Sequence, residues 1–91
     1  MSTETQAAIA AECDAIKAML LAKNKSYGNS FAEPVGIFAQ GLSPEEQVRV
    51  RIDDKLARIA KGDPSFGDED TVLDLIGYLV LLRVLQKGGA S

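Results

Sequence analysis

The chain has 91 residues, a formal net charge of −3, a single cysteine and no histidine. So short a chain makes one small domain, residues 1–91, with flexible tails expected at 1–4 and 88–91, and the helices predicted below make it all-α. Without histidine there is no Ser-His or Cys-His nucleophile pair, and the negative charge gives no general attraction to nucleic acid or to an acidic membrane. The lone Cys13, the lack of a basic N-terminal region and the short apolar runs indicate a cytoplasmic protein that neither spans a membrane nor is secreted.

A first helix is predicted over about residues 5–24, a stretch that is rich in Ala, Leu, Lys and Glu and contains neither Gly nor Pro. Its apolar positions recur at helical spacing, at Ile9, Cys13, Ile16 and Leu20. Gly28 ends this pattern, and a long, mostly irregular loop follows.

A second helix is predicted over about residues 43–61. Ser43 is a good N-cap, a proline follows it, and Glu46 completes a capping box three residues after the serine. Gly62 ends the helix. The apolar stripe of this helix consists of Val48, Ile52, Leu56 and Ile59.

A third helix is predicted over about residues 68–87, with Asp68 as its cap. Its middle, LIGYLVLLRVL, is apolar nearly all round, which is typical of a helix that is buried on most sides. Two other helices of so short a chain cannot cover it, so we expect a homo-oligomer, a dimer or higher, to complete the bundle. Alternatively, Phe31, Phe38 and the long loop cover the remaining surface.

Acidic residues fall at or beside the apolar face of each predicted helix. Asp70 and Asp74 share one face of the third helix, where like charges repel and a divalent cation would compensate them. Asp70 also suits the helix dipole without any function. Glu12 lies beside the stripe of the first helix, where it either reaches water or joins a site.

The second helix carries Arg51, Asp54, Lys55 and Arg58 on one flank. They form either a solvated ladder of ion pairs or a face where basic groups bind phosphate and the acid holds a metal. Oxygen ligands alone suit Mg²⁺ or Mn²⁺. The candidate metal ligands are Glu12, Asp54, Asp70 and Asp74, on the assumption that the three helices bring them together.

The segment KNKSYGNSF, residues 23–31, has two readings of its own. It can be the end of a helix, where lysines suit the dipole and Asn and Gly make the turn. It can also be a ligand site, with Lys23 for phosphate, Asn24 for a base edge, and Tyr27 and Phe31 for stacking.

Three blocks of the sequence, KNKSYGNSF, RIDDKLARI and DEDTVLDLIGYLVL, together resemble the nucleotide modification associated domain, type 1. This is a small all-helical family of phages and prophages. The resemblance covers roughly residues 20–85 and rests on motifs of the form KN-x-x-YG-x-SF, R-x-x-DK-x-x-R and E-D/S-x-x-D-x-x-x-DL-x-x-Y. The family looks related to the all-α nucleoside triphosphate pyrophosphohydrolases of the MazG and dimeric dUTPase group, which bind Mg²⁺ and oligomerise.

The resemblance implies that Asp54 and Asp74 are catalytic and help to hold Mg²⁺. The residues expected to bind the nucleotide are Lys23, Asn24, Tyr27, Ser30, Phe31, Arg51, Lys55, Arg58 and Tyr78. The chain departs from the MazG pattern, because its second helix has Asp53-Asp54 with basic neighbours in place of several glutamates. Three hypotheses follow: a Mg²⁺-dependent (deoxy)nucleoside triphosphate pyrophosphohydrolase, a non-catalytic nucleotide-binding oligomer or accessory to nucleotide modification, and a helical interaction protein with only surface acids.

Overall fold

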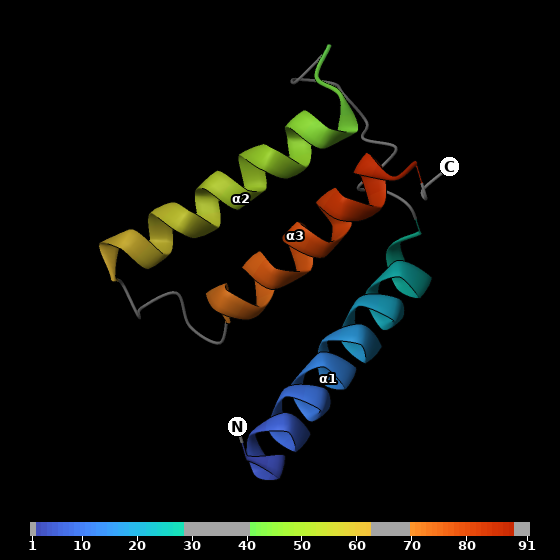
Figure 1. Cartoon of the computed structure of the whole chain (residues 1–91). Helices are drawn as coiled ribbons and strands as arrows, with labels where there is room; N and C mark the ends of the chain where they lie inside the picture. Colours follow the sequence, from blue (N-terminus) through green and yellow to red (C-terminus); the bar gives the residue numbers. More distant parts are fainter. Residues whose placement is uncertain (1, 29–40, 63–69, 89–91) are drawn as a thin grey trace.

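The computed structural model describes residues 2–28, 41–62 and 70–88, and the predicted all-α fold is confirmed for this part of the chain (Figure 1). The described residues form α1 (Thr3–Tyr27), α2 (Pro44–Lys61) and α3 (Thr71–Gln86), without a strand. The predicted ranges were too short for α1 at both ends, and they began α3 too early.

Helix α1 starts earlier than predicted because Ser2 caps it. The Ser2 hydroxyl oxygen accepts a hydrogen bond from the backbone N–H of Thr5 at 3.1 Å, which satisfies one of the free donors of the first turn. The helix continues to Tyr27 and ends at Gly28, whose φ of 63° lies in a region that favours glycine.

Helix α2 has the capping box that the sequence predicts. The N–H of Glu46 donates to the Ser43 hydroxyl at 3.1 Å, and the N–H of Ser43 donates to Oε1 of Glu46 at 3.3 Å. Gly62, in the left-handed conformation, ends the helix as predicted.

Helix α3 begins later than predicted because Asp70 is its N-cap. Oδ1 of Asp70 accepts a hydrogen bond from the N–H of Leu73 at 2.9 Å. The capping that we expected of Asp68 concerns a residue outside the described part of the chain. Asp70 therefore lies just before the helix, and its carboxylate is engaged with the backbone.

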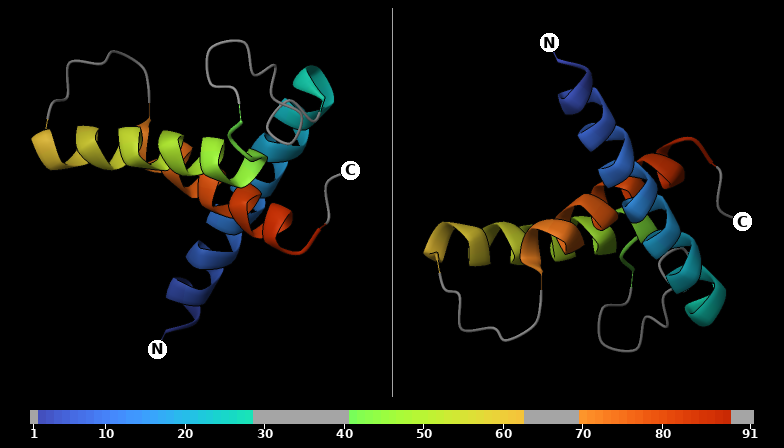
Figure 2. Two further views of the ribbon diagram at one scale, coloured as in Figure 1. Left: turned by 90° about the horizontal axis from the view of Figure 1, so that it is seen from above. Right: turned by 90° about the horizontal axis from the view of Figure 1, so that it is seen from below.

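Helix α3 lies between the other two helices. It runs antiparallel to α2, while α1 crosses it steeply, so that much of α1 extends beyond the α2–α3 pair (Figures 1 and 2). Contact between α1 and α3 occurs at Gly77, where a Cβ atom would lie only 3.2 Å from Cδ2 of Leu20. A side chain at this position would press against α1, so glycine permits the close approach.

The apolar core of the described residues is small. Val48 and Ile52 of α2 are buried, at 2% and 9% exposure. On α3, by contrast, only Gly77 is buried, and Val72 is 58% exposed. The expectation that α3 is buried on most sides is therefore not met within one copy of the described chain. Leu79 and Val80 are also exposed.

The sequence suggests two ways in which the exposed side chains of α3 could be covered. Covering by a second copy of the chain stays a prediction. Covering by Phe31 and Phe38 concerns residues that lie outside the described part of the chain. None of the helices in the described ranges is long and apolar enough to cross a bilayer.

The difference in burial along α2 can be tested with one chemical change at two positions. Val48→Ala should lower the free energy of unfolding by about 2 kcal/mol, because it removes two buried carbon atoms and leaves a cavity. Val50→Ala, on the same helix but at a side chain that is 51% exposed, should change it by less than about 0.5 kcal/mol. Urea denaturation at a fixed protein concentration measures both; equal losses would contradict this assignment of the core.

Candidate functional site

The carboxylate of Asp74, in the first turn of α3, lies close to lysines from both other helices. Nζ of Lys55, on α2, is 3.2 Å from Oδ2 of Asp74, and Nζ of Lys23, on α1, is 4.0 Å from Oδ1. The three charges sum to +1. This cluster, Lys23–Lys55–Asp74, is our candidate site.

The antiparallel arrangement of α2 and α3 explains why Lys55 reaches Asp74. The first turn of α3 lies beside the second half of α2, and Lys55 is three residues after the buried Ile52, so it shares the face that meets α3. Its side chain is only 10% exposed, and that of Asp74 is 21% exposed. The apolar stem of Lys55 thus covers part of the core while its ammonium pairs with the carboxylate.

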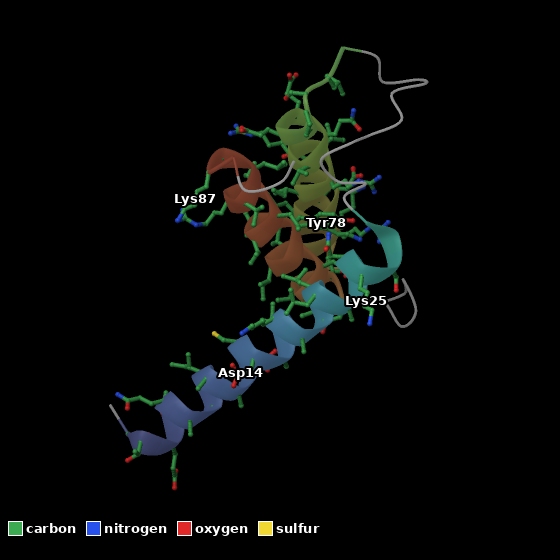
Figure 3. All side chains as sticks on the ribbon, turned by 90° about the vertical axis from the view of Figure 1, so that its right-hand side faces the viewer. Asp14, Lys25, Tyr78 and Lys87 are labelled. Carbon is green, nitrogen blue, oxygen red and sulfur yellow. The ribbon has the colours of Figure 1, made fainter. Side chains whose placement is uncertain are left out.

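Lys23 reaches the cluster because α1 crosses α3 at this point. Leu20 lies one turn before Lys23 on the same face of α1, and it packs on Gly77, which is three residues after Asp74. Figure 3 shows the C-terminal part of α1 running against α3, whereas Asp14 lies on the part that projects away. The Lys23 side chain remains 56% exposed.

The two ion pairs differ in strength. The Lys55–Asp74 pair is short and largely screened from water, so separating its partners leaves a charge in a poorly solvated place. The Lys23–Asp74 contact is at the outer limit of an ion pair and involves a side chain that is mostly in water, so it contributes little. Lys55 and Asp74 therefore form the fixed part of the site, and Lys23 is its exposed cation.

The predicted metal ligands do not gather around Asp74. Asp70 caps α3, Asp54 is exposed on α2, and Glu12 is exposed on α1. Among the described residues, no group of three or more acidic or cysteine side chains is placed to hold a metal ion. Asp74 itself faces two ammonium groups. This donor set does not fit a carboxylate-bound Mg²⁺.

The basic residues predicted on one flank of α2 differ in their burial. Lys55 turns inward to α3, Arg58 is half-buried, and Arg51 is exposed. No ion pair joins Asp54 to Arg51 among the described residues, so the predicted ladder is not formed between these two.

Asn24 and Tyr78, both predicted to bind the ligand, lie near the cluster along their own helices. Asn24 follows Lys23 directly, and its Nδ2 donates a hydrogen bond of 3.0 Å to the carbonyl oxygen of Gly28, closing the end of α1. Tyr78 is half-buried and one turn beyond Asp74 on α3. Asn24 therefore caps the C-terminal end of α1, as expected of an ordinary helix end.

Three further predicted ligand residues cannot be placed. Tyr27 is the last residue of α1, and its side chain lies outside the described part of the structure, as do Ser30 and Phe31.

The direct pairing of Lys55 with Asp74 was not predicted, although both residues were assigned to the site. A signal for it exists in the sequence: an acid on an apolar helix face needs a counter-charge, and Lys55 lies three residues after a core position of another helix. Which cation is used depends on how the helices cross.

No protein family, no curated protein and no solved structure matches this chain. The resemblance to the nucleotide modification associated domain therefore stays a prediction, and the site is interpreted from its own geometry.

Double-mutant cycles can measure the two ion pairs separately. The coupling free energy between Lys55→Met and Asp74→Asn should be about 1–2 kcal/mol, because this pair is short and screened from water. The coupling between Lys23→Met and Asp74→Asn should be below about 0.5 kcal/mol. Chemical denaturation of the single and double variants at one protein concentration gives both values. A larger coupling for Lys23 would contradict the division into a fixed pair and an exposed cation.

Proposed function

We propose that this protein binds the phosphate groups of a nucleotide at the Lys23–Lys55–Asp74 cluster, as a homo-oligomer and without a metal ion. The observation that carries the proposal is the meeting of two lysines from different helices at one carboxylate, with distances of 3.2 and 4.0 Å. Their charges exceed that of the acid by one, which favours an additional anion.

Lys23 is the side chain that would contact the phosphate first. Its ammonium is only loosely held by Asp74 and is more than half exposed, so it can turn toward a ligand at small cost. A phosphate oxygen is a strong, charged acceptor for such a donor. Asp74 keeps Lys55 in position and balances the charge of its buried ammonium before the ligand arrives.

The nucleoside part of the ligand would be recognised beside the phosphate. The half-buried ring of Tyr78, one turn from Asp74, offers a flat face on which a base can stack. Asn24, next to Lys23, has the amide chemistry that suits a base edge. The predicted contributions of Tyr27, Ser30 and Phe31 to the same ligand belong to this proposal.

Binding is favoured over hydrolysis because the acids in the described part of the chain do not form a group. A metal-dependent pyrophosphohydrolase needs several carboxylates around one or two ions, and the described residues show no such group. Hydrolysis of the nucleotide is the alternative, and the experiment described below distinguishes it from binding alone.

The oligomeric part of the proposal is supported by exposed apolar side chains on all three helices, among them Ile9, Leu56 and Val72. A soluble chain that left so many exposed would tend to associate.

The proposal predicts metal-independent nucleotide binding that depends on Lys23. Isothermal titration calorimetry with ribo- and deoxynucleoside mono-, di- and triphosphates should find at least one ligand whose affinity is unchanged by EDTA. Lys23→Ala should weaken that ligand about tenfold, the effect of losing one charge-assisted hydrogen bond.

Lys25→Ala is the matched control, because Lys25 is also exposed and near the end of α1 but points to the opposite side of the helix. It should change affinity by less than about twofold, an effect too small for a lost hydrogen bond.

Chromatography of the same mixtures, with Mg²⁺ and then Mn²⁺, should show intact nucleotides. Release of pyrophosphate that is lost in Asp74→Ala would overturn the binding-only proposal in favour of the hydrolase. Binding of no nucleotide would reject both.

A further inference from the structure

We draw no further inference here: the strongest candidate, the surface patch of exposed apolar side chains on α3 at Val72, Leu79 and Val80, is left uncovered by the described residues, and nothing in the structure shows what covers it.

Discussion

An acidic side chain half-buried between three helices, that of Asp74, is the constraint on which the rest of this structure depends. A carboxylate in the first turn of an apolar helix would be costly without a counter-charge. Lys55 supplies it from α2, at 3.2 Å and largely out of water, and so links α2 to α3 at this point. Lys23 comes to the same carboxylate from α1, but more loosely.

The glycine that follows in α3 makes this meeting possible. Gly77 has no side chain to hold α1 away, and Cδ2 of Leu20 lies only 3.2 Å from the place where a Cβ would be. Lys23, one turn further along α1, is thereby brought to Asp74. The close packing at Gly77 and the charge of Asp74, three residues apart on α3, together place Lys23 at the candidate site.

Local rules predicted much of the fold but little of the site. The capping box of Ser43 and Glu46 was predicted in both of its hydrogen bonds because all its partners lie within four residues. The start of α3 was misplaced because Asp68, Glu69 and Asp70 stand in succession, and the local sequence does not decide between the two aspartates as caps.

The pairing of Lys55 with Asp74 could not be predicted, because it depends on the crossing of two helices that are separated by a loop. The predicted convergence of several carboxylates assumed a crossing geometry, and the described residues bring lysines to Asp74 instead. One polar residue on each of three apolar faces is compatible with either arrangement, so the residue types alone do not distinguish a metal site from an anion site.

The candidate site and the projecting helix are connected through α1. Lys23 can serve the site only while α1 stays against α3, and within the described chain the contact that holds it is confined to a short segment that includes Ile16, Met19 and Leu20. Any contact that held α1 against α3 would therefore reduce the conformational entropy that a ligand at Lys23 must otherwise remove. Packing of α1 on α3 and binding of an anion at Lys23 would then favour each other, because both require α1 in one position.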